Sequence, residues 1–357
     1  MSNFYCYYSR KCGIIIDIDF GKVGFFMLRA FLFDLHSILL PTVSDRKQED
    51  IPHTVPGIVH LLEALHKQDI LTAVISLYSR RETEFYLRQS GMHRYVDRLL
   101  ADPSMTPMNH LFTQMLQRLG TSADSVLYVS SDPENIQEAA SLRIGSIGYT
   151  PVDSYVHFMK EALVLIESFE DLTPSFFQNV WLRSRGKPVT IADTRRLIIR
   201  ELAEEDIDDL YQIYQDPQIR KYIDNIDDYR EIEVNKLRAY IRNVYSFYGY
   251  GLWGVFSKTT HGIIGRCGIE NHQIDGREEI MLSYLLDSHH WGYGYALECC
   301  RAVLAYAHDE LDIHRIVAVI EKHNTRSIHT AQNLNMTLEK EISWHDKDCF
   351  LYAIHFD

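Results

Sequence analysis

The segment Ser288-His289-His290-Trp291-Gly292-Tyr293-Gly294-Tyr295-Ala296-Leu297-Glu298 decides how the C-terminal half of this chain is read. Residues 280–286 before it alternate between apolar and polar positions and predict a strand, and residues 296–308 after it predict a helix. N–H groups at a glycine turn and the positive end of the helix that follows suit a pyrophosphate. No Lys follows the glycines, so the turn is not the nucleotide P-loop pattern, and a plain tight turn is the alternative.

A second segment lies downstream of this turn. Residues 316–320 form a β-branched run that predicts a buried strand. It leads into Glu321-Lys322-His323-Asn324-Thr325-Arg326-Ser327-Ile328 and a helix that we expect to end near Leu334. Residues 350–356 alternate like a closing strand.

With these segments in place, residues 194–357 resemble the GCN5-related N-acetyltransferase (GNAT) family, and most closely its ribosomal-protein N-acetyltransferase branch. Residues 196–202 resemble the opening strand of the family, residues 204–211 its first helix, and residues 324–328 its Asn-x-x-Ser motif. The resemblance implies an α+β acyl-CoA N-acyltransferase fold with a mixed sheet. It also implies that acetyl-CoA is the co-substrate and that an amine attacks its thioester directly. The acceptor stays open between a protein N-terminus, a ribosomal protein, a small amine and an antibiotic.

The resemblance also assigns the cofactor contacts. The pyrophosphate is expected on the N–H groups from Trp291 to Ala296, and the pantetheine amides along the backbone of strand 281–285. Asn324 is expected to hold the pantetheine arm, with Ser327 one helical turn along on the same face. The predicted cofactor-binding residues are Leu282, Tyr284, Leu285, Trp291, Gly292, Tyr293, Gly294, Tyr295, Ala296, Asn324 and Ser327.

Direct attack on a thioester needs a base for the amine proton and donors for the carbonyl oxygen. Candidate bases are Glu279, Glu270 and Glu278, with a solvated strand-end carboxylate as the alternative reading of Glu279. Some relatives carry a tyrosine general acid on the helix after the Asn motif, and that position is Ala331 in this sequence. Tyr352 or a water molecule is the expected substitute.

The N-terminal half has a different pattern, in which strands alternate with helices. This alternation predicts a Rossmann-like, doubly wound parallel sheet, with polar residues gathered at the ends of the strands. The predicted strands are 30–33, 71–75 and 126–129, and the predicted helices are 59–66, 81–90 and 135–142.

Residues 30 to about 170 resemble the haloacid dehalogenase (HAD)-like hydrolase superfamily. The resemblance makes Asp34 the nucleophile and Ser76 the Ser/Thr of the second motif. His36 stands where the second acid of the first motif is usual, and Thr106 stands in place of the usual Lys. The gaps after Asp34 and Ser76 are too short for a cap, so we expect a capless domain with an open site.

The metal-binding carboxylates of this motif set are also changed. Ser131 and Asn135 replace two of them, and Asp132 is displaced by one residue. Mg²⁺ prefers anionic oxygen ligands, so we predict no metal here and an inactive, hydrolase-like domain. The alternatives are a Mg²⁺-dependent phosphatase using Asp34, His36 and Asp132, whose acetyltransferase fold only binds an acyl-CoA, and a non-enzymatic sensor in which both halves bind ligands.

Length and composition bound the remaining possibilities. A chain of 357 residues suggests two domains, which we place at 27–170 and 194–357, joined by a linker over 171–193. Residues 1–26 read as an extension, with Met27 as an alternative natural start. Aspartate and glutamate total 49 against 36 lysines and arginines, which argues against nucleic acid as a partner.

Cysteine usage and hydropathy indicate a compartment. The six cysteines show neither metal spacing nor a disulfide framework, and no apolar run is long enough to cross a bilayer. We therefore expect a cytoplasmic protein with no membrane partner. The sequence does not indicate an oligomeric state.

Overall fold

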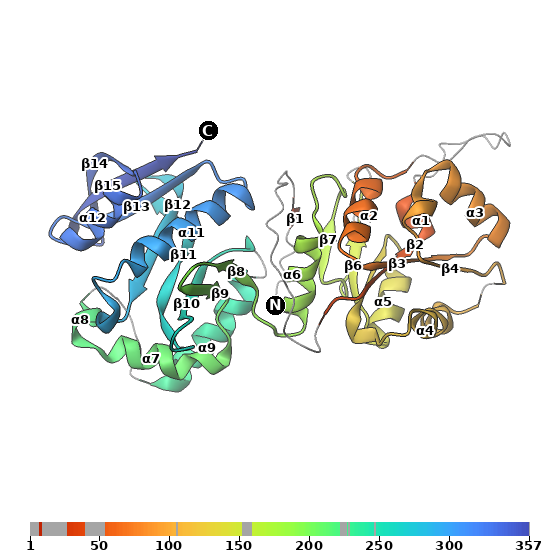
Figure 1. Ribbon diagram of the computed structural model, residues 1–357, viewed down its shortest axis with the longest axis horizontal. Coiled ribbons are helices and arrows are strands. Elements are labelled where there is room, and N and C mark those ends of the chain that lie inside the picture. Colours follow the sequence, from red (N-terminus) through yellow and green to blue (C-terminus); the bar gives the residue numbers. More distant parts are fainter. Residues whose placement is uncertain are drawn as a thin grey trace. The chain divides into compact units, whose positions relative to one another are not determined.

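The computed structural model describes residues 7–8, 27–39, 54–104, 106–151, 159–221, 227, 229–245 and 248–356. The chain divides into two compact units, Met1–Arg185 and Gly186–Asp357, which are described separately (Figure 1). Among the described residues, none of the helices combines the length and the apolar character needed to cross a membrane.

The first unit is built on a seven-stranded sheet whose strands are all parallel, in the order β1-β7-β6-β5-β2-β3-β4. The central position of β2 places Asp34, its last residue, at the carboxyl edge of the sheet, where such folds bind ligands. The predicted doubly wound parallel sheet is therefore confirmed. Its strands are β1 (Tyr7–Tyr8), β2 (Ala30–Asp34), β3 (Leu71–Ser76), β4 (Arg98–Ala101), β5 (Val126–Ser130), β6 (Gly145–Tyr149) and β7 (Val164–Ile166).

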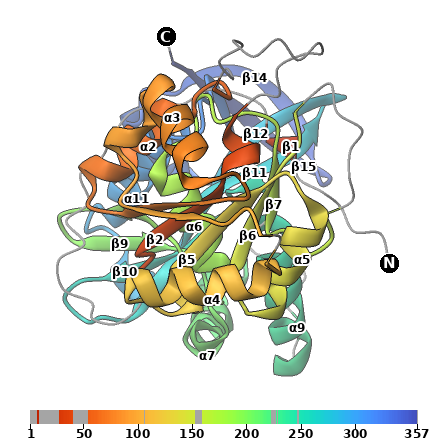
Figure 2. The same ribbon diagram turned by 90° about the vertical axis from the view of Figure 1, so that its right-hand side faces the viewer.

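Helices cover both faces of this sheet because the side chains of its strands alternate between two cores. Phe31 and Phe33 of β2 pack in the core under α2, whereas Ala30 and Leu32 pack in the core under α4. Figure 2 shows α2 and α3 on one side of the sheet and α4 on the other. The helices are α1 (Leu35–Ile38), α2 (Ile58–Lys67), α3 (Arg80–Gln89), α4 (Met108–Leu119), α5 (Pro133–Ser141) and α6 (Pro174–Ser184), with the short turns η1 (Met92–Arg94) and η2 (Ala123–Ser125).

The segment 171–193, which the sequence suggested as a linker, is mostly regular structure. Helix α6 buries Phe177 and Trp181 in the core of the first unit, and the Trp181 indole N–H donates to the carbonyl of Asp124 at 2.9 Å. Strand β8 (Thr190–Asp193) pairs with β9 in the second unit. The apolar residues of this segment order it, because they are buried or half-buried in the unit beside it.

The second unit holds an eight-stranded mixed sheet in the order β14-β15-β13-β12-β11-β10-β9-β8. Only β12 and β13 run parallel; the other neighbours are antiparallel. The predicted mixed sheet is therefore confirmed. Besides β8, its strands are β9 (Leu197–Arg200), β10 (Leu252–Ser257), β11 (Ile263–Ile274), β12 (Arg277–Leu286), β13 (Arg315–Glu321), β14 (Thr337–Trp344) and β15 (Lys347–His355).

Helices lie on both faces of the mixed sheet as well. Leu285 of β12 packs with the core formed by α7 and α9, whereas Cys267 of β11 contacts Cys300 of α11. The helices are α7 (Ile207–Gln215), α8 (Pro217–Arg220), α9 (Arg230–Tyr240), α11 (Tyr295–Asp309) and α12 (Thr325–Asn333), with the short elements η3 (Glu204–Asp206), η4 (Ile241–Tyr245) and η5 (Ser288–His290).

Candidate functional site

The parallel strands β12 and β13 pair at a single position. Met281 lies opposite Val317, and within residues 277–321, all of which the structure describes, these strands share no other paired position. The other edge of β12 is paired with β11 along its whole length. From Leu282 to Leu286, β12 therefore has one edge that β13 does not pair, and this edge leads directly to the glycine turn.

The glycine turn has the geometry of an anion-binding loop. Gly292 and Gly294 have φ angles of 83° and 78°, a region that side chains with a Cβ disfavour. Helix α11 starts directly after Gly294, and its first backbone hydrogen bond runs from the N–H of Glu298 to the Gly294 carbonyl at 3.1 Å. The N–H groups of the helix's first turn therefore have no acceptor within the helix. The N–H of Trp291, predicted as part of this set, donates instead to the Ser288 carbonyl at 3.2 Å.

A carboxylate at the start of the turn organises its two histidines. Asp287 accepts hydrogen bonds from the Nδ1 atoms of His289 and His290, each at 3.0 Å, and from the backbone N–H of His289 at 3.2 Å. The hydrogen bond to Asp287 raises the pKa of His289. Asp287 therefore fixes both imidazole rings at the start of the turn.

An ion pair between Arg196, directly before β9, and Glu298 of α11 supports the turn. Arg196 donates from Nε to a carboxylate oxygen of Glu298 at 2.6 Å and from Nη1 to the Tyr293 carbonyl at 2.8 Å. Its guanidinium also lies 4.3 Å from the centre of the Tyr295 ring. Arg196 was not among the predicted site residues, since the sequence alone does not place β9 beside α11.

The Asn motif at the start of α12 faces β12. The Asn324 side chain accepts from the Ser327 N–H at 3.2 Å and so caps the helix, which leaves its amide N–H groups for another acceptor. The Tyr284 hydroxyl of β12 hydrogen-bonds the Ser327 hydroxyl at 3.1 Å. The Arg326 guanidinium lies 4.5 Å from the centre of the Trp291 ring, which places a cation beside the glycine turn.

The candidate base Glu279 is held in an ion pair. Its two carboxylate oxygens accept from Nε and Nη2 of Arg315 at 3.0 and 3.1 Å. Arg315 also donates to Glu339 at 2.7 and 3.0 Å. Both oxygens of this carboxylate are therefore engaged by one guanidinium in a bidentate ion pair. Glu278 lies in the exposed hairpin end of β12, where it accepts from Gln273 at 3.2 Å.

The other candidate, Glu270, lies beside the single position at which β12 and β13 pair. It is directly opposite Met281, and Met281 is opposite Val317. The Tyr240 hydroxyl donates to the Glu270 carboxylate at 2.8 Å, and the Tyr240 hydroxyl oxygen accepts from the Leu252 N–H at 2.7 Å. Burial raises the pKa of Tyr240, so its proton stays on the phenol and its orientation is fixed.

Tyr352, the predicted substitute for the general acid, is in the middle of β15. It pairs with Ala318 of β13 and Leu338 of β14 and is 4% exposed. Strands on both sides of β15 therefore surround it.

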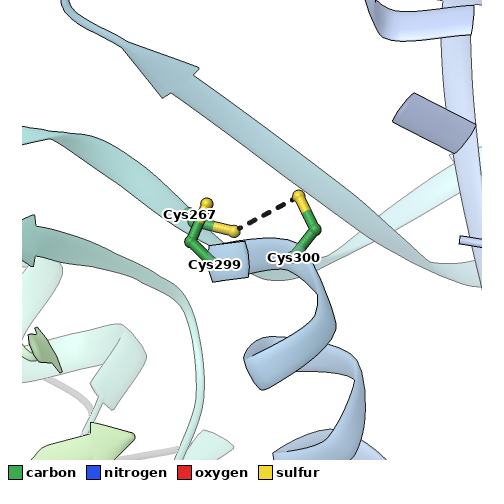
Figure 3. Close-up of side chains that lie close together, drawn as sticks. All are labelled: Cys267, Cys299 and Cys300. Atoms are coloured by element: carbon green, nitrogen blue, oxygen red, sulfur yellow. Dashed lines mark hydrogen bonds between the residues drawn. The ribbon is translucent and has the colours of Figure 1, made fainter. Parts of the chain in front are cut away.

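Three buried thiols lie together between β11 and α11 (Figure 3). The Sγ atoms of Cys267 and Cys300 are 3.8 Å apart, and Cys299 is beside them. Burial raises the pKa of Cys267 and Cys300 well above the ordinary thiol value, whereas hydrogen bonds with these two thiols lower the pKa of Cys299 to about 5. Two of the three thiols therefore keep their protons, which opposes the thiolate form that binds metals. We read the cluster as core packing.

In the first unit, Asp34 is surrounded by neutral donors. Its carboxylate accepts from the Ser130 hydroxyl at 3.2 Å, the Asn135 amide at 3.4 Å and the His36 N–H at 3.1 Å. Burial raises the pKa of Asp34, which opposes the ionised form that a nucleophile requires. The Ser76 hydroxyl at the end of β3 accepts from Thr83 at 2.8 Å.

The remaining polar residues of this edge are engaged in local structure. The Asp132 side chain accepts from the Glu134 N–H at 2.8 Å and caps α5. The Thr106 hydroxyl donates to Asp102 at 2.7 Å. Within the described part of the chain, the thiol cluster is the only convergent group of three or more metal-ligating side chains, so no such group surrounds Asp34.

Each half of the chain is similar to known proteins. Residues 196–337 match the family model for the acetyltransferase (GNAT) domain, and residues 29–149 match the one for haloacid dehalogenase-like hydrolases. The uncharacterized N-acetyltransferase p20 of Bacillus licheniformis is 32% identical over 156 residues, which cover 43% of this chain and 86% of p20. The uncharacterized protein YkkB of Bacillus subtilis (strain 168) is 30% identical over 162 residues, covering 44% of this chain and 92% of YkkB.

Among solved structures, this chain is similar to the ribosomal-protein-S5-alanine acetyltransferase of Vibrio fischeri, with 17% identity and a TM-score of 0.42. The match covers 47% of this chain and 98% of the Vibrio fischeri chain. The sequence matches show that this chain belongs, through its C-terminal half, to the GNAT family of N-acetyltransferases. Its N-terminal half is haloacid dehalogenase-like. Both predicted resemblances are confirmed.

Proposed function

We propose that this protein transfers the acetyl group of acetyl-CoA to an amine by direct attack of the amine on the thioester. The observation that carries the proposal is that β12 and β13 stop pairing after Met281 and Val317, directly before the glycine turn. An unpaired strand edge followed by an anion-binding turn matches, in order, the amide-bearing arm and the pyrophosphate of CoA.

The binding roles follow from this order. The N–H groups from Gly292 to Ala296 receive the pyrophosphate, and the pantetheine amides pair with the edge of β12 that includes Leu282, Tyr284 and Leu285. Arg326 adds positive charge near the turn. Asn324 offers the pantetheine its amide N–H groups, because its carbonyl oxygen already caps α12.

We propose Glu270 as the base that accepts the amine proton. It lies opposite Met281, the last residue of β12 that pairs with β13, and therefore next to the place where the thioester begins. Its contact with Tyr240 orients the carboxylate without neutralising it, whereas Arg315 holds Glu279 as an ion-pair partner. The acceptor is an amine, either a protein N-terminus or a small amine.

For the first unit we propose a non-catalytic role. Asp34 is buried among neutral donors and Asp132 caps a helix, so the carboxylates that a Mg²⁺-dependent phosphatase needs do not converge. Release of phosphate from p-nitrophenyl phosphate with Mg²⁺, abolished by Asp34→Asn, would instead support the phosphatase alternative.

The central test is acetyl-CoA binding by calorimetry, using the full chain and two matched variants. Gly292→Glu places bulk and negative charge in the turn, and Gly276→Glu makes the same change in the remote β11–β12 hairpin. The two glycines are comparable, with φ angles of 83° and 75° and no atom within 4 Å of an added Cβ. We expect the wild type and Gly276→Glu to bind and Gly292→Glu to lose binding. A folded wild type that does not bind acetyl-CoA would refute the proposal.

Binding alone does not distinguish an enzyme from a sensor. Release of CoA is therefore measured with spermine and with a tetrapeptide that has a free N-terminal alanine. Acetylation of either acceptor supports the transferase, whereas tight binding with no transfer to any amine supports the non-enzymatic sensor.

A further inference from the structure

Two side-chain contacts connect α12 to the segment that runs along the free edge of β12 into the glycine turn. The Tyr284 hydroxyl hydrogen-bonds the Ser327 hydroxyl at 3.1 Å, and the Arg326 guanidinium lies 4.5 Å from the centre of the Trp291 ring. Ser327 and Arg326 are both in the first turn of α12, which follows β13. Both contacts therefore cross the space between β12 and α12, where the pantetheine arm of a bound CoA is proposed to lie.

The two contacts lie on opposite faces of the mixed sheet. Neighbouring residues of a strand point to opposite faces, and residues directly opposite in an antiparallel pair share a face. Tyr284 is opposite Cys267, whose thiol contacts α11, whereas its neighbour Leu285 packs with Trp291 in the core formed by α7 and α9. The free edge of β12 is therefore bridged on one face by the hydroxyl pair and on the other by the contact between guanidinium and indole.

The two partners of the second contact differ in how firmly they are held. The Trp291 ring is half-buried, and its Nε1–H donates to the Leu286 carbonyl at 2.7 Å. The Arg326 side chain is exposed, and within the described residues its guanidinium has no hydrogen-bond or ion-pair partner. An exposed cation–π contact favours the closed arrangement only about two- to fivefold, so the arginine can move away from a fixed indole.

We propose that Arg326 is a strap, which must leave Trp291 before CoA can enter the groove beside β12 and which closes again over the bound pantetheine arm. This inference rests on the proposed cofactor site. An arm whose amides pair with a strand edge reaches that edge most directly from the side. On the face of α7 and α9, the Arg326–Trp291 contact blocks this path, so entry and release both depend on its opening.

A strap and a simple phosphate contact predict opposite changes in the rate of association. A cation that only attracts the pyrophosphate speeds association, so its removal slows binding. A cation that closes the groove lowers the fraction of molecules able to bind, so its removal speeds binding. If the closed state is favoured about two- to fivefold, kon should rise about three- to sixfold when the strap is removed.

The test is stopped-flow fluorescence of CoA binding to the full chain, at about 1 M salt, where the Debye length is about 3 Å and attraction of the phosphates is largely screened. We expect Arg326→Gln to raise kon about three- to sixfold and to raise koff as well. Arg326→Lys keeps the charge but not the planar group that stacks on the indole, so it should raise kon by a smaller factor.

Arg301→Gln is the matched control. It removes an exposed positive charge from α11 whose guanidinium donates to the Asn333 carbonyl at 3.2 Å, away from the turn, so both rate constants should be unchanged. An equal rise of kon in Arg301→Gln and Arg326→Gln would overturn the proposal, because net charge and not the strap would then govern entry.

The remaining outcomes separate this inference from the proposed function. If CoA binds and kon in Arg326→Gln is unchanged or lower at high salt, the arm threads beneath the contact or Arg326 serves only the phosphates; the strap is then wrong and the transferase proposal stands. If the folded wild type does not bind CoA, the proposed cofactor site fails and this inference fails with it.

Discussion

The carboxylate of Glu298, in the first turn of α11, accepts hydrogen bonds from both the side chain and the backbone of Arg196, at 2.6 and 2.9 Å. It also accepts from the Thr194 hydroxyl at 2.7 Å. Arg196 in turn donates to the Tyr293 carbonyl. The glycine turn is therefore positioned by Thr194 and Arg196, which lie between β8 and β9, far before the turn in the sequence. The conformation of the candidate anion site therefore depends on this contact.

Glu298→Gln tests that dependence. Burial alone would raise the pKa of Glu298, but its hydrogen bonds with Thr194 and Arg196 lower it overall. The stability it contributes is therefore present above its ordinary pKa of 4.5 and is lost as the pH falls through the lowered value. Because Arg196 is partly exposed, we expect a loss of only about 1–2 kcal/mol in the free energy of unfolding at neutral pH. Urea denaturation at several pH values measures it.

The difference between wild type and Glu298→Gln should shrink as the solution is made acidic. Glu204→Gln is the control, since it breaks an exposed ion pair with Arg238 in the same unit and should change stability little. Equal effects of both variants at all pH values would show that the contact to Arg196 does not organise the turn.

Substitutions of the two candidate bases, Glu270 and Glu279, should have different effects on kcat. Glu270→Gln keeps the hydrogen bond from Tyr240 but cannot accept the amine proton, so kcat should fall by about 10²–10⁴-fold. Glu279→Gln should act mainly on stability, because it removes one of the two carboxylate partners of Arg315. Steady-state kinetics with acetyl-CoA, together with urea denaturation, compares the two. A large loss of kcat in a fully stable Glu279→Gln variant would make Glu279 the base.

Asp34 should destabilise the first unit as the pH rises. Its folded pKa is raised above the ordinary value of 3.8 by burial, so the folded state holds the proton more tightly than the unfolded state. Stability then falls as the pH climbs from the ordinary pKa to the raised one, by about 1.4 kcal/mol for each unit between them. Asp34→Asn does not titrate, so its stability relative to the wild type should increase over that interval. A difference that is independent of pH would show that the pKa is not raised.

Gly268 in β11 is expected to tolerate no side chain. A Cβ there would lie 1.9 Å from the Gly251 carbonyl oxygen, so the backbone before β10 would have to move. We expect Gly268→Ala to cost more than about 2 kcal/mol, a size typical of overpacking. Gly276→Ala is the matched control, because only its φ of 75° opposes the change, which costs about 1 kcal/mol. Thermal melting compares them, and equal losses would contradict the close approach.

Much of the fold could be predicted from local pattern. The β-branched run 316–320 became β13, the segment 280–286 lies within β12, and the helix after the glycine turn starts at Tyr295. These elements were predictable because apolar periodicity reports which side of a strand or helix is buried. The structure of the segment 171–193 was less predictable, since the burial of Phe177 and Trp181 depends on a core built from other segments.

The candidate site was also predictable in part from the sequence and in part only from the tertiary structure. The sequence by itself determined the family motifs, the strand–turn–helix order at Gly292 and Gly294, and the loss of carboxylates around Asp34. Only the tertiary structure decided that Glu279 is bound to Arg315 and that Glu270 lies opposite Met281, where β12 and β13 pair. The physical reason is that a motif is written in consecutive residues, whereas the charge state and direction of a side chain depend on strand register and on partners far along the chain.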